Sequence, residues 1–86
     1  MYKVVYLDKV EKDLKGIDKK TAKKILDRIE SYLAKDPQGL GKALKGDFSG
    51  YWRYRLGDYR VIYRIADQEV LILVLRIGHR KNIYDE

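Results

Sequence analysis

The sequence predicts an α+β fold in which helices cover one face of a mostly antiparallel sheet, and three patterns carry this prediction. Residues 51–66 alternate with the two-residue period of half-buried strands, on both sides of a Gly-Asp pair. Residues 18–35 place apolar side chains at helical spacing. Residues 70–75 are apolar throughout, as in a strand that is covered on both sides. The order of these segments predicts the topology β-α-α-β-β-β.

The N-terminal segment predicts a strand and a short helix. Residues 2–7 are rich in Val and Tyr, which favour strands. Asp8 is then expected to cap a helix, because Glu11 three residues later completes a capping box. Gly16 is expected to end this helix after about two turns. The first two elements therefore form a β-α unit.

A longer amphipathic helix is predicted next. Asp18 is expected to be its N-cap, and the helix is expected to run to about Lys35, where an Asp-Pro pair prevents continuation. Residues 37–50 contain four glycines without a sustained period. This composition predicts a connection, with a short extended piece at residues 43–45.

The C-terminal half predicts a hairpin followed by an inner strand. Gly57 at the first position of a two-residue loop favours a type II′ turn between the two strands of the hairpin. The apolar strand at residues 70–75 follows, and residues 76–86 are expected to leave it as a polar C-terminal segment. All of these elements belong to a single domain of residues 1–86, because the chain is too short for two cores.

The charge balance points to a polyanionic partner. The formal net charge is +6, and six of the seven arginines lie between Arg53 and Arg80, whereas lysines dominate residues 3–45. Scattered lysines on helices mainly favour solubility. Arginine has a planar fork that suits phosphate recognition, so the second half of the chain is the candidate binding region.

Several classes of protein are disfavoured by composition. The chain has no cysteine and a single histidine, His79, and its carboxylates are not clustered, so the residues offer no ligand set for a metal and no cofactor is expected. No apolar run approaches the ~20 residues of a membrane span, and the N-terminus does not resemble a signal peptide. We therefore expect a cytoplasmic protein without a membrane partner.

The arginines of the hairpin are predicted to share one face of the sheet. Arg53 and Arg55 lie two residues apart on one strand, Arg60 lies across the turn on the next, and Arg80 follows the inner strand. Like charges side by side are unfavourable unless an anion fills the space between them. Tyr and Trp residues alternate with these arginines, either as core residues or as surfaces on which bases of single-stranded RNA stack.

Four motifs complete this region of the sequence: Leu44-Lys45-Gly46, Gly50-Tyr51-Trp52-Arg53, Gly57-Asp58-Tyr59-Arg60-Val61-Ile62-Tyr63, and Gly78-His79-Arg80-Lys81 through Tyr84. Together they resemble the RelE/ParE superfamily of type II toxins, over essentially the whole chain. The resemblance implies the fold named above. For the RelE branch it also implies a metal-free endoribonuclease that cuts mRNA in the ribosomal A site and is blocked by a cognate antitoxin protein.

The resemblance assigns roles by position. The paired basic residues of the family fall on Arg53 and Arg55, and its later arginines fall on Arg60 and Arg80. Its C-terminal tyrosine falls on Tyr84. The residues expected to be catalytic are then Arg60, His79, Arg80 and Tyr84. Those expected to bind RNA or phosphate are Arg53, Arg55, Lys45 and Lys81.

The chain departs from the pattern of the family at the expected base. RelE-type enzymes often have lysine at the paired positions, but arginine stays protonated and cannot act as a base. Another branch of the family uses a glutamate as the base, and the corresponding region of this chain, residues 42–44, contains no carboxylate. His79 is therefore the best titratable candidate, as acid or as base, and no second proton carrier is assigned.

Two alternatives stay open at this stage. One is a toxin of the ParE branch, which inhibits DNA gyrase and has no nuclease site. The other is a non-catalytic relative that only binds RNA, with a steep dependence on salt.

Overall fold

The structure is a computed structural model that describes residues 1–81. Its helices and strands follow one another along the chain in this order: β1 (Lys3–Tyr6), α1 (Asp8–Lys15), α2 (Lys19–Ser31), the 3-10 helix η1 (Leu33–Lys35), α3 (Pro37–Leu40), β2 (Lys42–Ala43), the 3-10 helix η2 (Gly46–Phe48), β3 (Trp52–Leu56), β4 (Tyr59–Ala66), the 3-10 helix η3 (Asp67–Glu69) and β5 (Leu71–His79).

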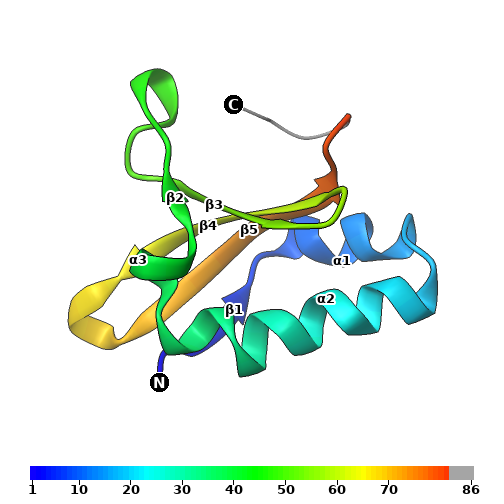
Figure 1. Ribbon diagram of the computed structural model, residues 1–86, viewed down its shortest axis with the longest axis horizontal. Coiled ribbons are helices and arrows are strands. Elements are labelled where there is room, and N and C mark those ends of the chain that lie inside the picture. The colour runs from blue at the N-terminus through cyan, green and yellow to red at the C-terminus, as the bar shows by residue number, and fades with distance from the viewer. Residues whose placement is uncertain (82–86) are drawn as a thin grey trace.

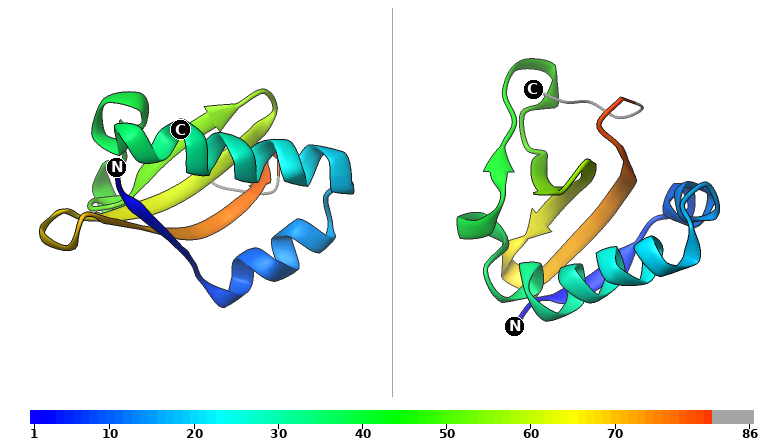
Figure 2. Two further views of the ribbon diagram at one scale, coloured as in Figure 1. Left: turned by 90° about the horizontal axis from the view of Figure 1, so that it is seen from below. Right: turned by 45° about the vertical axis from the view of Figure 1, so that its right-hand side comes forward.

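The strands form one sheet in the order β1-β5-β4-β3-β2. β1 runs parallel to β5, and the other neighbours are antiparallel. Helices α1 and α2 lie together on one side of this sheet (Figure 1). Figure 2 shows the same arrangement: α2 crosses in front of the strands in the left view, which is seen from below, and lies beneath them in the right view. The predicted α+β class is confirmed, and residues 71–75 lie in β5, an inner strand of the sheet. Val70 lies before β5 and is exposed, and α1 and α2 cover only one face of the sheet, so the prediction of a strand over residues 70–75 covered on both sides was wrong in these two respects.

The core lies between the helices and the sheet. Its buried residues come from both layers, and the fully buried ones include Val10, Ile25 and Ile29 from the helices and Val61 and Val74 from the sheet. Burial of apolar side chains at about 25 cal/mol per Å² holds the two layers together. The amphipathic pattern of α2 therefore predicted the buried face correctly.

The helix boundaries confirm one predicted cap and contradict another. Asp18 is the N-cap of α2, and its carboxylate accepts a hydrogen bond from the backbone N–H of Thr21 at 3.1 Å. Asp8, by contrast, is the first helical residue of α1, and Leu7 is the N-cap without a side-chain hydrogen bond. The prediction of Asp8 as a cap, with its capping box to Glu11, was wrong. An acidic residue is favourable in the first turn without capping it, because it faces the positive end of the helix dipole.

The connection after α2 is more ordered than predicted. The helix ends at Ser31 and continues as η1, and Asp36 then caps α3 by accepting from the backbone N–H of Gly39. Pro37 suits the first turn of a helix, where its missing N–H has no partner to lose. The extended piece predicted at residues 43–45 is β2, shifted toward the N-terminus.

Gly41 brings this connection close to the sheet. The hydroxyl of Tyr63 on β4 donates to the carbonyl oxygen of Pro37 at 2.6 Å. A Cβ atom added at Gly41 would lie 1.8 Å from that hydroxyl oxygen. Only glycine fits this close approach of the segment between α3 and β2 to Tyr63.

The hairpin between β3 and β4 has the predicted turn. Leu56 pairs with Tyr59, which leaves a loop of two residues. Gly57 has a φ of 58°, whereas Asp58 does not have a positive φ. A positive φ at the first loop residue alone is the signature of a type II′ turn.

Candidate nucleic-acid interface

The register of the sheet separates the arginines of the hairpin from the helix-facing core. Tyr54 pairs with Val61, and both belong to the core. Their neighbours along the strands point to the other side, where Arg55 pairs with Arg60. Arg53 lies on this side as well, opposite Ile62. The predicted arginine face therefore exists, and it is the side of the sheet that α1 and α2 do not cover (Figure 1).

The arginines of this face differ sharply in exposure. Arg60 is 1% exposed, and its Nη1 donates to the carbonyl oxygens of Gly57 and Tyr59, each at 3.1 Å. Arg53 is 4% exposed, whereas Arg55 is exposed to solvent. Arg60 thus braces the hairpin turn. Alternation predicts which face a side chain occupies but not how deeply it lies, so the sequence did not separate these arginines.

Arg80 joins the same end of the sheet from the neighbouring strand. Its backbone N–H donates to the carbonyl oxygen of Asp58 at 2.8 Å. Its guanidinium Nε lies 3.9 Å from the carboxylate of Asp58, with its side chain 52% exposed. Lys81, also exposed, follows it. The hairpin end of the sheet therefore presents Arg55, Arg80 and Lys81 as accessible cations.

His79 lies on the opposite side of the sheet from Arg60. It pairs in register with Tyr59, and the two rings meet edge to face with their centroids 5.6 Å apart. Its Nδ1 accepts a hydrogen bond from the backbone N–H of Lys81 at 3.2 Å. The ring lines a pocket of about 270 Å³ against Lys12 and Asp13 of α1.

This placement corrects the sequence analysis, which expected His79 in a polar C-terminal segment beside the arginine cluster. β5 continues to His79, three residues beyond the charged Arg76. In a strand, successive residues point to opposite faces. Gly78, which pairs with Arg60, therefore lies on the arginine face, and His79 lies on the helix-covered face. His79 is near the arginine cluster in sequence and at the same end of the sheet, but it faces α1.

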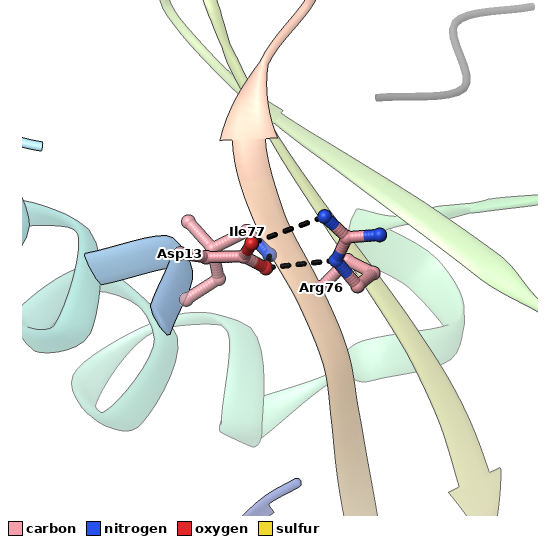
Figure 3. A network of polar contacts seen from close by, with 3 residues as sticks. All are labelled: Asp13, Arg76 and Ile77. Carbon is pink, nitrogen blue, oxygen red and sulfur yellow. Dashed lines mark hydrogen bonds and ion pairs between the residues drawn. The ribbon is translucent and has the colours of Figure 1, made fainter. Parts of the chain in front are cut away.

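A contact between α1 and β5 holds this end of the molecule (Figure 3). The carboxylate of Asp13 accepts from Nε and Nη2 of Arg76 at 2.9 and 3.1 Å, and also from the backbone N–H of Ile77 at 3.0 Å. β1 ends at Tyr6, which pairs with Val74, so the next residues of β5 have no strand beside them on that edge. Asp13 takes the place of a strand partner there, and its hydrogen bond raises the pKa of Arg76. The sequence did not predict this pair, because its members are distant in the chain.

The remaining predicted residues do not join this cluster. Lys45 is exposed but follows β2, whose Ala43 pairs with Trp52 at the far end of β3 from the turn. Tyr84 lies outside the described residues. Within residues 1–81, no group of three His, Asp or Glu side chains is placed to hold a metal ion, and no helix is both long and apolar enough to cross a membrane.

Comparison with known proteins identifies the family. The family described as "ParE toxin of type II toxin-antitoxin system, parDE" matches residues 4–84. The chain belongs to this family of type II toxins. Among relatives of this toxin, Toxin RelE of Mycobacterium tuberculosis is 31% identical over 83 residues, which are 96% of this chain and 86% of that protein. Toxin YoeB of Mycobacterium bovis is 43% identical over 63 residues, 69% of this chain and 73% of that protein.

The fold of the toxin matches as well. The crystal structure of the toxin–antitoxin complex RelBE2 from Mycobacterium tuberculosis superimposes with a TM-score of 0.88 and 28% identity, over 92% of this chain and 98% of that one. The family carries the ParE name, but these relatives carry RelE and YoeB names. They therefore support the RelE branch, the branch of endoribonucleases, over the gyrase-inhibiting ParE branch.

Proposed function

We propose that this toxin cleaves mRNA in the ribosomal A site and that its hairpin end binds the scissile phosphate. The observation that carries the proposal is the convergence of Arg55 and Arg80, both exposed, at one end of the uncovered face of the sheet. Two guanidinium groups at such a position suit the non-bridging oxygens of a phosphodiester. The toxin works in the cytoplasm, where its substrate is translated.

The reaction is an in-line displacement at phosphorus. The ribose 2′-oxygen forms a bond to the adjacent phosphorus and loses its proton to a base, while the bond from phosphorus to the 5′-oxygen breaks and that oxygen gains a proton. The products are a 2′,3′-cyclic phosphate and a 5′-hydroxyl end. Charge builds up on the phosphate oxygens in the transition state, and preorganised cations stabilise it there.

The residues divide into contacting and positioning groups. Arg55 and Arg80 contact the phosphate, with Lys81 beside them. Arg60 and Arg53 act as positioning residues, because both are buried and Arg60 donates to the carbonyls of the turn. This proposal differs from the catalytic role that the resemblance implied for Arg60.

His79 is the titratable group that supports proton transfer at this end of the sheet. Its Nδ1 accepts the backbone N–H of Lys81, so Nε2 is the nitrogen left to exchange a proton with the substrate. Because the ring faces α1 and the phosphate is bound on the other side of the sheet, the imidazole has to turn around the end of β5 to reach the 2′-oxygen. Tyr84 is proposed to contact a base or to assist the second proton transfer.

A cognate antitoxin is the proposed protein partner. The RelBE2 structure, which this chain resembles along nearly its whole length, is a toxin–antitoxin complex. With a formal net charge of +6, this toxin suits an acidic antitoxin segment over its arginine face. Such a segment would cover Arg55 and Arg80 and exclude RNA.

The test uses purified toxin and ribosomes programmed with an mRNA, with 5′-hydroxyl ends mapped at single-nucleotide resolution. Wild-type toxin is expected to cut within the A-site codon. The Arg55→Ala and Arg80→Ala variants are each expected to lose about 10²- to 10³-fold in rate. Lys20→Ala is the matched control, because it removes one exposed cation from α2.

Intact mRNA with wild-type toxin would contradict the proposed function. If DNA breaks appeared instead, the gyrase-inhibiting activity that the name of the family suggests would be favoured. Full cleavage by both arginine variants would remove only the assignment of the phosphate site.

A further inference from the structure

A groove of about 780 Å³ runs across the uncovered face of the sheet, beside the arginines. Its floor is formed by Ile62 of β4 and Leu75 of β5. Ile62 is buried but does not belong to the helix-side core, in keeping with its position opposite Arg53. Leu75 is the extra residue of a β-bulge, since Ile62 pairs with Arg76 and Tyr63 with Val74.

One wall of the groove is aromatic. Phe48 and Tyr51 stand on the connection between β2 and β3, with ring centroids 6.5 Å apart and planes tilted by 53°. The guanidinium of Arg64 lies over the ring of Tyr51, at 5.7 Å from its centroid. Phe48 is half-buried, although it lies outside the core. The wall therefore offers flat apolar surfaces with a cation next to them.

The charges around the groove favour a polyanion. Arg60, Ile62 and Arg64 alternate along the same face of β4, so the apolar floor lies between two cationic positions. The opposite wall carries Lys9, Asp8 and Arg76, and the guanidinium of Arg76 is paired with Asp13, so the cations that favour a polyanion are those of β4. Apolar surface for a flat ring, set among cations for a backbone, is the combination that binds single-stranded nucleic acid.

The spacing links this groove to the proposed phosphate site. Tyr51 directly precedes β3 and is four residues along the chain from Arg55, which is about 13 Å at the rise of a strand. About two nucleotide steps of an extended strand cover this length. A base two nucleotides from the scissile phosphate therefore reaches the aromatic wall of the groove.

We propose that this groove binds an unpaired nucleobase of the mRNA about two nucleotides from the scissile phosphate, with Phe48 and Tyr51 as the stacking surface. The proposal rests on the proposed function, since it places the base relative to the cleavage site. Stacking is tolerant of base identity, but a walled groove discriminates purines from pyrimidines by size. The groove then contributes to the sequence preference of the toxin.

The test measures the affinity of the toxin for programmed ribosomes whose A-site codon carries 2′-O-methyl groups and cannot be cleaved. An abasic nucleotide replaces one base at a time, in the codon and on either side of it. With wild-type toxin, one abasic position is expected to weaken binding about tenfold. Phe48→Ala is expected to weaken binding of the intact mRNA by a similar factor and to make that abasic position nearly neutral.

Tyr51→Phe is the matched variant, because it keeps the ring and is expected to bind like wild type. Thermal unfolding of each variant checks that the fold is intact. If the losses from Phe48→Ala and from every abasic position were simply additive, the groove would not hold a base and the proposal would be overturned. Weaker binding of the co-purified antitoxin by Phe48→Ala, with RNA binding unchanged, would also overturn it and assign the groove to the antitoxin.

The two proposals fail in different ways. Base-dependent binding without cleavage of an unmodified mRNA would remove the proposed reaction but support the groove. If the toxin cleaves mRNA but its affinity depends on no single base, the proposed reaction stands and the proposed base-binding role of the groove is overturned.

Discussion

The two faces of the sheet bury very different side chains. Toward the helices, β4 contributes Val61 and Tyr63, which are fully buried among apolar residues. Toward the other side, the same strand contributes Arg60, which is just as buried but is bound to backbone carbonyls of the turn. One strand therefore supports a core on one face and a cationic surface on the other.

This difference shows how a small toxin combines stability with a binding surface. Apolar burial between the helices and the sheet supplies the free energy of folding. A buried guanidinium is costly to desolvate, and the hydrogen bonds of Arg60 to the carbonyls of the turn offset that cost. Arg60 also adds positive potential beneath the exposed Arg55 and Arg80.

The largest effect on stability is expected on the helix-covered face. Ile29 of α2 is fully buried in the core. Replacing it by alanine leaves a cavity, so Ile29→Ala is expected to lower the free energy of unfolding by about 2–5 kcal/mol in urea denaturation. Leu7→Ala is the control, because Leu7 is 40% exposed. An equal loss in both variants would show that burial does not distinguish these positions.

A comparison of two arginines tests the uncovered face. Arg60→Ala leaves the carbonyls of Gly57 and Tyr59 without their donor, and it is expected to cost about 1.5–3 kcal/mol of stability. Arg55→Ala, at an exposed position, is expected to change stability by less than about 0.5 kcal/mol while lowering cleavage. Thermal unfolding and cleavage are measured on both. Equal stability of the two variants would contradict the bracing role of Arg60.

The contact between α1 and β5 is expected to have a smaller effect. Asp13→Asn keeps an acceptor for the N–H of Ile77 but loses the ion pair with Arg76, whose side chain is 44% exposed. Solvent weakens such a pair, so the expected loss is about 1 kcal/mol. Hydrogen exchange at the end of β5 should accelerate more than exchange in β3. Uniform acceleration would show that the contact does not act locally.

A single polar contact on the helix-covered side is expected to have an effect of similar size at neutral pH. Tyr63→Phe loses the hydrogen bond to Pro37 and is expected to cost about 0.5–1.5 kcal/mol. Burial raises the pKa of Tyr63 above its usual value of 10.0. The unfolded chain therefore ionises first, so this contribution is complete below pH 10 and falls as the pH rises toward the folded-state pKa.

Urea denaturation between pH 8 and 11 measures this dependence. Wild-type toxin is expected to lose stability above pH 10 more steeply than Tyr63→Phe. The pKa of Tyr6 is also raised, by burial and by its hydrogen bond to Glu30. Tyr6 therefore accounts for part of the pH dependence of stability that remains in the Tyr63→Phe variant. Parallel curves for the two proteins would contradict the role of Tyr63.

Much of the fold was predictable because its signals are local. Apolar spacing identified α2, a glycine identified the turn of the hairpin, and Asp18 was correctly predicted as a cap. The wrong cap at Asp8 has a local cause as well, since acidic residues favour both the cap and the first turn of a helix. The short helix α3 was missed because it has only four residues and no period of its own.

The candidate site was predictable only in part. Alternation correctly placed Arg53, Arg55 and Arg60 on one face. It could not show that Arg60 is buried, since depth depends on what the rest of the chain packs around a side chain. The groove walled by Phe48 and Tyr51 was also missed, because it needs the loop after β2 to stand over a bulged strand that is distant in sequence.

The sequence by itself determined the class of fold, the family and the cationic face, because residue period, motif order and charge are properties of neighbouring residues. Only the tertiary structure decided which cations are accessible and that His79 faces α1. The face that His79 occupies was decided by how far β5 extends and by its register with β4. One extra residue in a strand turns every later side chain to the other face. The extent of β5 depends on its pairing with β4 on one edge and on its hydrogen bond to Asp13 of α1 on the other.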